Sequence, residues 1–167
     1  NREMGRSLMK ELGYSKEKPL KVKLSTRAIS IYVDTAVLVI DHLKHVYIDA
    51  TLDQVETGNW HAKVAKRDYQ IAFNLTGVGI DDPDANFYEN YTCGSKRNYS
   101  DYCNPELEKL FDKQSAEMDF EKRLKLVHEI DLKLQQDVAR PILLHRLTYS
   151  AWYPYVKNVV IHQSTYN

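Results

Sequence analysis

Cys93 and Cys103 are the only cysteines of the chain, and they bracket a polar loop of nine residues. Three kinds of site use cysteines: a structural disulfide, half of a metal site, and a redox pair. Redox enzymes usually space their cysteines by two residues, and a structural zinc site needs four ligands. A disulfide, which requires an oxidising compartment, is therefore favoured, with two free thiols in a cytosolic protein as the alternative.

A second group of residues has the chemistry of metal ligands: Asp41, His42, His45 and Asp49. Positions three apart on a helix share a face, but Asp49 falls on the following predicted strand and no further His or Cys lies nearby in sequence. The pair His128–Glu129 lacks the second histidine of the zinc hydrolases. Solvent-exposed helix residues explain both groups, and no metal site is predicted.

The glycines Gly77 and Gly79 follow a predicted strand, where phosphate-binding loops also occur. They lack the third glycine and the following Lys-Ser/Thr of such loops, and the chain contains no G-x-S-x-G nucleophile motif. These motifs give little support to nucleotide binding, and we predict no catalytic residue and no cofactor.

Length and charge narrow the class of protein further. A chain of 167 residues with 43% hydrophobic residues can bury one sizeable core. The 23 basic residues balance the 23 acidic ones, so nucleic acid is not an expected partner. The longest apolar run, residues 36–40, is far shorter than the roughly 18 residues of a spanning helix. The first residues read as the middle of a helix, which suggests an excised piece.

Hydrophobic periodicity predicts strands and helices in alternation. Apolar and polar residues alternate over 20–26, 48–53 and 69–75, which is the pattern of strands with one buried face. Spacings of three or four residues predict helices up to Gly13, over 33–43 and 60–66, after Asn104–Pro105, and after Asp119. Two further strands are predicted at 142–147 and 159–162. Strand, helix, strand order predicts parallel pairing.

The long predicted helix that Asp119 caps carries a broad apolar face, which is expected to be core. Its members are Phe120, Leu124, Val127, Ile130, Leu134 and Val138. Pro141 is expected to end this helix.

Six segments, in this order and spacing, resemble the C-terminal lobe of the extracellular solute-binding proteins of ABC importers, in the peptide- and nickel-binding group (family 5). They are L-K-V-K-L-S-T, A-V-L-V-I-D-H-L-K-H-V-Y-I-D-A-T-L, R-D-Y-Q-I-A-F-N, D-D-P-D-A-N-F-Y, N-P-E-L-E-K-L-F and D-F-E-K-R-L-K-L-V-H-E-I-D-L-K-L-Q-Q-D-V-A-R-P-I-L-L. The resemblance covers nearly the whole chain. It implies an α/β fold that forms one lobe of a two-lobed periplasmic-binding-protein-like fold, with a mixed sheet flanked by helices. Residues 1–167 would be a partial C-terminal lobe without its N-terminal lobe.

The resemblance also implies the function of the chain. It would be the solute-binding component of an importer in the periplasm and not an enzyme. Its three partners would be a small-molecule solute, the permease transmembrane subunits and the N-terminal lobe of the same protein. Dipeptide-binding members have a similar cysteine pair before an N-P-E helix. The resemblance therefore implies a periplasmic disulfide between Cys93 and Cys103.

The resemblance places an aromatic residue and the loop 76–82 at the cleft between the lobes. The ligand-binding candidates are Trp60, Asn74, Thr76, Gly77, Gly79 and Asp81. Packing at the start of a helix is the alternative role for Trp60, since tryptophan is often buried without any ligand.

One departure from the resemblance bears on the ligand. Peptide-binding relatives carry a tryptophan and an aspartate in this loop, and the aspartate pairs with the ammonium group of the ligand. Thr76 and Gly79 stand at those positions here. An ammonium ion without a counter-charge in a closed cleft is costly, and Asp81 or Asp82 would have to reach in from the turn. We expect a solute that is not an ordinary free-amino peptide, and that is neutral, anionic or modified.

Two other classes of protein fit part of the sequence. A small secreted redox or hydrolytic enzyme would use the cysteines. A stand-alone interaction domain would use a surface rich in tyrosine, of which the chain has 12.

Overall fold

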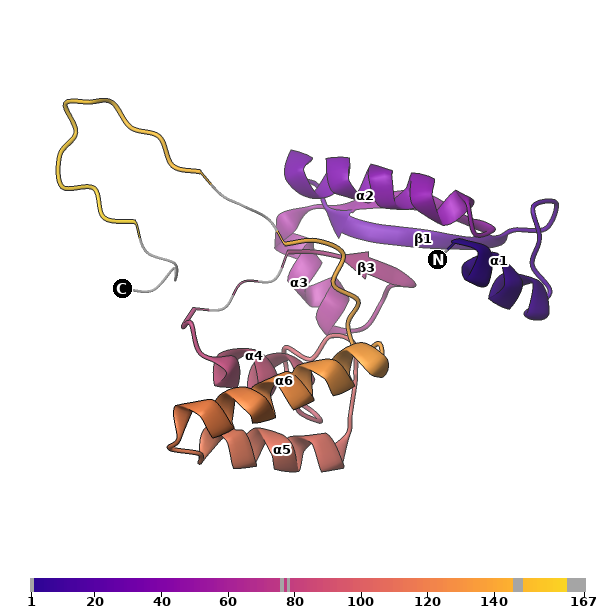
Figure 1. Cartoon of the computed structure of the whole chain (residues 1–167). Helices are drawn as coiled ribbons and strands as arrows, with labels where there is room; N and C mark the ends of the chain where they lie inside the picture. Colours follow the sequence, from indigo (N-terminus) through magenta and orange to yellow (C-terminus); the bar gives the residue numbers. More distant parts are fainter. Residues whose placement is uncertain (1, 76, 78, 146–148, 162–167) are drawn as a thin grey trace. The chain divides into compact units, whose positions relative to one another are not determined.

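A computed structural model describes residues 2–75, 77, 79–145 and 149–161 of the chain. These residues form two compact units, Asn1–Thr76 and Gly77–Asn167, and each unit is described by itself. The first unit contains a small sheet, and the second contains three helices (Figure 1).

The first unit is an α/β arrangement whose strands are all parallel among the described residues. Its elements are α1 (Arg2–Glu11), β1 (Leu20–Arg27), α2 (Ser30–Lys44), β2 (Ile48–Val55), α3 (Thr57–Ala65) and β3 (Ile71–Phe73). The strand order is β2-β1-β3, with Leu20 opposite Ile48 and Leu24 opposite Ile71. The predicted α/β fold class and the parallel pairing are confirmed, and no antiparallel pair forms within the described part of the chain.

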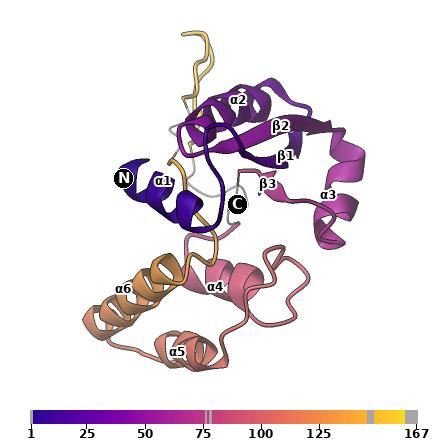
Figure 2. The ribbon, with the colours of Figure 1, turned by 90° about the vertical axis from the view of Figure 1, so that its right-hand side faces the viewer.

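The alternation along the strands gives this sheet one apolar and one polar face. Leu24 and Ala50 are buried against Ala36 of α2, which lies along the strands in both views (Figures 1 and 2). On the other face, Asp53 accepts a hydrogen bond of 2.7 Å from Ser25, and Lys63 of α3 lies 3.6 Å from the same carboxylate. The helices α2 and α3 therefore contact opposite faces of the sheet.

The end of α1 confirms a predicted cap. Gly13 follows the helix with a φ of +84°, a conformation that glycine adopts without strain, and its amide donates to Lys10 O. Within α1, a Cβ on Gly5 would lie 2.9 Å from Val46 Cγ1, so this glycine allows the helix to approach the turn after α2.

The second unit contains α4 (Pro83–Tyr91), α5 (Pro105–Ser115) and α6 (Phe120–Gln136). An Asp or Asn side chain caps each of them: Asp82 accepts from Asp84 N, Asn104 from Leu107 N, and Asp119 from Lys122 N. The predicted starts of α5 and α6 are confirmed. Sequence analysis missed α4, although Asp82 followed by proline is the same cap signal that identified α5.

The core of the second unit lies between its three helices. Its buried members are Phe87, Tyr91, Leu107, Phe111, Ile130, Leu134 and Ala139. The predicted apolar face of α6 is only partly right, because Phe120 is 73% exposed and Val138 is 64% exposed. Phe120 is the first residue of α6, and Val138 lies beyond its end with a φ of +52°, so neither shares the buried stripe. The helix also ends at Gln136, before Pro141.

Two predicted strands are not formed in the described residues. Residues 142–145 and 159–161 have no strand pairing, and Ile142, Leu143 and Leu144 are exposed. The rest of both predictions, 146–147 and 162, lies outside the described residues. A strand exists only where a sheet edge pairs with it, and an apolar run of this length does not specify that edge.

Among the described residues, no helix is both long enough and apolar enough to cross a membrane.

Candidate functional site

The two cysteines form a disulfide, which confirms that prediction. Cys93 and Cys103 are joined with their Cα atoms 4.6 Å apart, and no described cysteine is free. Within the loop, the buried Asn98 donates from Nδ2 to Thr92 O at 3.0 Å and to Tyr102 O at 2.6 Å. Glu108 of α5 accepts a hydrogen bond from Cys93 N. The bond and these contacts fix the loop between α4 and α5.

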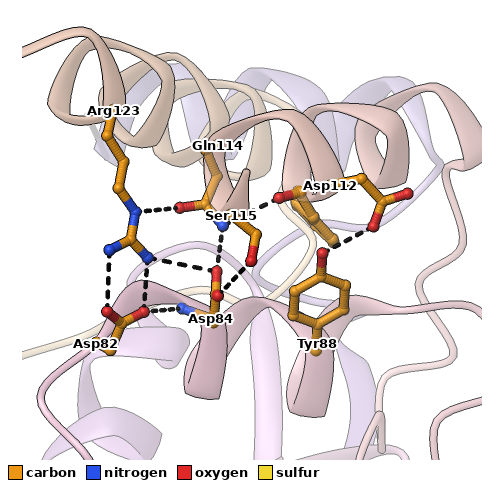
Figure 3. A network of polar contacts seen from close by, with 8 residues as sticks. Asp82, Asp84, Tyr88, Asp112, Gln114, Ser115 and Arg123 are labelled. Atoms are coloured by element: carbon orange, nitrogen blue, oxygen red, sulfur yellow. Dashed lines mark hydrogen bonds and ion pairs between the residues drawn. The ribbon is translucent and has the colours of Figure 1, made fainter. Parts of the chain in front are cut away.

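A polar network joins the starts of α4 and α6 (Figure 3). Arg123 donates to both carboxylate oxygens of Asp82, from Nη2 at 2.8 Å and from Nη1 at 3.1 Å. Such a two-point pair is among the strongest polar contacts in proteins. The hydrogen bonds from Arg123, and then the one from the Asp84 amide, hold the pKa of Asp82 below its usual range.

The same network extends to α5. Asp84 accepts hydrogen bonds from Gln114 Nε2 and from Ser115 Oγ, the latter at 2.6 Å, and it lies 3.6 Å from Arg123. Beside them, Tyr88 donates to Asp112 at 2.7 Å (Figure 3). Burial, and then this hydrogen bond, raise the pKa of Tyr88 to about 12. These contacts stabilise the fold of the second unit, because each charged group meets an opposite charge or a hydrogen-bond partner.

The network determines which carboxylate near the loop 76–82 is available to pair with a charged group of a ligand. Asp82 is used by Arg123 and by the cap of α4. Asp81 is exposed and makes no hydrogen bond or ion pair with any described residue. Of the two aspartates considered as substitutes for the missing loop carboxylate, only Asp81 is free to act.

The predicted ligand-binding residues fall in both units. In the first unit, Trp60 of α3 is 1% exposed, and Asn74 lies half-buried after β3. In the second unit, Gly77 is exposed, Gly79 is half-buried and Asp81 is exposed. Thr76 lies outside the described residues. The loop is therefore not sealed by packed side chains at its described positions.

Sequence analysis missed one candidate, Arg27 at the carboxyl end of β1. Its Nη1 donates to Tyr32 Oη at 3.2 Å, its Nη2 lies 3.5 Å from Thr57 Oγ1, and its guanidinium carbon stands 5.1 Å from the Tyr32 ring centroid. No described carboxylate pairs with it. A positive residue at the end of an otherwise alternating strand is the one signal in the sequence that marks it.

The residues with metal-ligand chemistry are not assembled into a cluster in the described part of the chain. No group of three or more His, Cys, Asp or Glu side chains there is arranged to hold a metal ion. Asp41 lies 3.8 Å from Lys44, one turn along the same helix, and Asp49 lies on β2. Glu129 lies 3.9 Å from Lys133.

Comparison with solved structures identifies the fold. Among the similar structures is NikA from Staphylococcus aureus in complex with nickel and L-histidine, with a TM-score of 0.73, 22% identity, and 83% of this chain and 30% of that chain covered. Another is OppA from Haemophilus influenzae in complex with the peptide RPPGFSPFR, with a TM-score of 0.74, 23% identity, and 81% and 27% covered. A third is DppA from Helicobacter pylori, a periplasmic binding protein associated with an ABC transporter, in complex with the peptide STSA. Its TM-score is 0.70 at 21% identity, with 80% and 27% covered.

The chain thus has the fold of part of a solute-binding protein of the NikA, OppA and DppA type. It spans 26% to 30% of the length of such proteins. No family model matches the sequence, and no curated protein matches it. At these identities the likeness defines the fold, and the role of the chain follows by proposal.

Proposed function

We propose that the chain is part of the C-terminal lobe of the solute-binding component of an ABC importer. The observation that carries this proposal is the likeness of more than four fifths of the chain to structures solved with a nickel complex or with peptides. In two-lobed binding proteins, closure of the lobes around a solute is a hinge motion without chemical change. The proposed role is capture and delivery, and no bond is broken.

The proposal includes three partners and a location. The partners are a small-molecule solute, the N-terminal lobe of the same protein, and the transmembrane subunits of a permease. The location is the periplasm. The disulfide between Cys93 and Cys103 supports this location, because such bonds persist in oxidising compartments.

We propose that the ligand-binding candidates border the cleft between the lobes. They are Trp60, Asn74, Thr76, Gly77, Gly79 and Asp81. The exposure of Gly77 and Asp81 supports this role for the loop, since a sealed turn would not reach a solute. The burial of Trp60 favours packing at the start of α3, and its ligand role stays a prediction.

The solute we propose is not an ordinary free-amino peptide. Gly79 has no side chain to pair with an ammonium group, and Asp82 already pairs with Arg123. Only the exposed Asp81 is left for that task. An ammonium group enclosed without a counter-charge would lose several kcal/mol, so free dipeptides should bind poorly.

A thermal-shift screen of small solutes on the protein with both of its lobes tests the function. A true solute at 100 times its dissociation constant should stabilise the protein by about 2.7 kcal/mol, seen as a raised Tm. Dialanine serves as the free-amino probe, and N-acetyl-dialanine is its matched control without the ammonium group. Nanomolar affinity for dialanine would refute the proposed ligand class. A gene that encodes no second lobe, together with no stabilising solute, would refute the function.

The alternative of a redox enzyme loses its basis in this structure. Both cysteines are joined to each other, and the described residues leave no free thiol to act as a nucleophile. We propose no second function.

A further inference from the structure

The turn between α5 and α6 exposes two large apolar side chains, and residues 117–121 are called the α5–α6 tip below. Met118 is 96% exposed and Phe120 is 73% exposed. Single exposed apolar residues are ordinary on soluble proteins, but here two of them lie two positions apart in one turn. Methionine and phenylalanine are both enriched in protein interfaces. The tip therefore has the composition of a docking surface.

Hydrogen bonds fix the backbone of the α5–α6 tip. Glu117 N donates to Gln114 O at 3.2 Å, and Gln114 is fully buried. Asp119 N donates to the Glu117 carboxylate at 2.9 Å. The Asp119 side chain caps α6 by accepting from Lys122 N. A surface that is ordered before it binds loses less conformational entropy on binding. The two apolar side chains are thus presented on a prearranged turn.

The polar network of the second unit ties this tip to the loop 76–82. Arg123, in the first turn of α6, donates to both carboxylate oxygens of Asp82, which ends that loop (Figure 3). Ser115, at the end of α5, donates to Asp84. The proposed function places the loop at the edge of the cleft between the lobes. The tip then lies beside the edge from which a solute leaves, and a permease that receives the solute must face this side.

The charges around the tip indicate the chemistry of its partner. Glu117, Asp119 and Glu121 alternate with the two apolar residues. Lys122 follows them and lies 3.7 Å from the Asp119 carboxylate, whereas Glu121 pairs with no described residue. An acidic rim around apolar side chains fits an apolar recess that is rimmed by Lys or Arg. The same rim disfavours the anionic surface of a membrane, which attracts basic segments.

We propose that the α5–α6 tip docks into a basic-rimmed apolar recess on the transmembrane subunits of the permease. This inference rests on the proposed function and deepens it, because it gives the permease a defined contact on this chain. Met118 and Phe120 enter the recess and contribute most of the affinity, as desolvated central anchors do. Glu117 and Glu121 face its basic rim and speed the encounter.

A site-specific photocrosslink identifies what covers the tip. The full-length protein carries p-benzoylphenylalanine in place of Phe120 in its own cells, and the control carries it in place of Leu132, which is 56% exposed on α6. Position 120 should crosslink to a membrane-spanning permease subunit, and position 132 should not. A crosslink from position 120 to a second copy, to another part of the same chain, to lipid, to a soluble protein or to nothing overturns the proposal. Equal permease yields from both positions also overturn it.

Binding to that permease in lipid nanodiscs measures what the apolar side chains contribute. The full-length M118A/F120A variant should bind at least about tenfold more weakly than wild type, and L132A should bind like wild type. Because both tip side chains are exposed, M118A/F120A should unfold in urea like wild type. Unchanged binding overturns the proposal. A marked loss of stability also overturns it, because the tip would then pack within the full-length protein.

Association kinetics measure the acidic rim separately. E121K should slow association with the nanodisc permease, and added salt should reduce the difference from wild type. E129K makes the same charge change two turns further along α6 and should associate like wild type. Equal slowing by both variants would mean that net charge, rather than the rim of the tip, sets the rate, and would overturn the rim contact.

The outcomes separate this inference from the proposed function. Solutes that stabilise the protein in the screen, together with a permease that binds wild type and M118A/F120A equally, would overturn the tip contact and leave the importer role standing. A permease crosslink from position 120 with no solute from the screen would support the contact and count against the proposed capture of a small solute.

Discussion

Each unit contains a half-buried arginine, and the two arginines have opposite surroundings. Arg123 in the second unit meets the carboxylates of Asp82 and Asp84. Arg27 in the first unit meets two hydroxyls and an aromatic ring, and its Nε has no partner in the described chain. The sequence marks Arg27 only by its place at the end of a strand, and it does not show which groups either arginine meets.

The contrast separates structural from functional use of the same side chain. A paired arginine stabilises the fold, because removing it leaves two carboxylates without a counter-charge. An arginine without a carboxylate contributes little to the fold and is available to a ligand. The predictions below test this difference, beginning with the packing that holds the second unit together.

The largest loss of stability is expected from a substitution in the core of the second unit. Phe111 is fully buried and stacks on Phe87 with ring centroids 5.1 Å apart. Phe111→Ala should lower the free energy of unfolding by about 3 to 5 kcal/mol, from lost burial and a cavity. Urea unfolding measures it, with Phe120→Ala as the control, since Phe120 is 73% exposed. Equal losses for both variants would contradict the assigned core.

Loss of the disulfide should cause the second-largest drop in the free energy of unfolding. Replacing Cys93 and Cys103 together by alanine removes the constraint on the loop and should cost about 2 to 3 kcal/mol. Urea unfolding with and without reductant measures this, and the double variant should no longer respond to reductant. Stability unchanged by the replacement would mean that Asn98 and Glu108 hold the loop without the bond.

Removal of Arg123 should have a smaller but clear effect. The side chains of Arg123 and Asp82 are 27% and 36% exposed, so solvent weakens the pair relative to a fully buried one. We expect Arg123→Gln to cost about 1 to 2 kcal/mol. Lys122→Ala, on the same turn, removes only an exposed ion pair of 3.7 Å with Asp119 and should change stability by less than about 0.5 kcal/mol.

The same pair predicts a dependence on acid pH. The pKa of Asp82 is lowered in the folded protein, mainly by its hydrogen bonds with Arg123. Its stabilising contribution is therefore present above the usual pKa of an aspartate and is lost as the pH falls through the lowered pKa. In Arg123→Gln the loss of stability below about pH 4 should be shallower than in wild type. Identical slopes in the two proteins would show that Asp82 does not titrate in this way.

The smallest expected change in stability comes from the titration of Tyr88, and this change is visible only at alkaline pH. Burial, and then the hydrogen bond to Asp112, raise its pKa to about 12. Its contribution to stability is complete below about pH 10 and is lost as the pH rises towards about 12. The difference in tyrosinate absorbance between wild type and Tyr88→Phe should show a group that titrates near 12. A difference curve centred near 10 would contradict this environment.

Local sequence signals predicted much of this fold. Alternation gave β1 and β2, and three- or four-residue spacing gave α2 and α6, because both patterns reflect which face of an element is buried. The cap residues Asn104 and Asp119 were likewise predictable, because a cap is recognised from the residues next to it in sequence. The cysteine pair was favoured as a disulfide, and the resemblance implied the same bond.

The features that were missed depend on contacts distant in sequence. The pairing of Arg123 with Asp82 joins residues 41 positions apart, and Arg27 meets Thr57 across 30 positions. The predicted strand at 142–147 failed over its described residues for a related reason, because pairing requires an edge that the run itself does not specify. The start of α4 is different, since Asp82–Pro83 carried a local cap signal that was interpreted only as a turn.

The comparison of the two arginines is tested most directly by unfolding R27Q and R123Q side by side in urea, without any solute. We predict that R27Q stays within about 0.5 kcal/mol of wild type, since no carboxylate loses its partner. R123Q should lose about 1 to 2 kcal/mol, because Asp82 and Asp84 lose their counter-charge. A loss in R27Q as large as that in R123Q would contradict the account, because it would make Arg27 a structural residue rather than one available to a ligand.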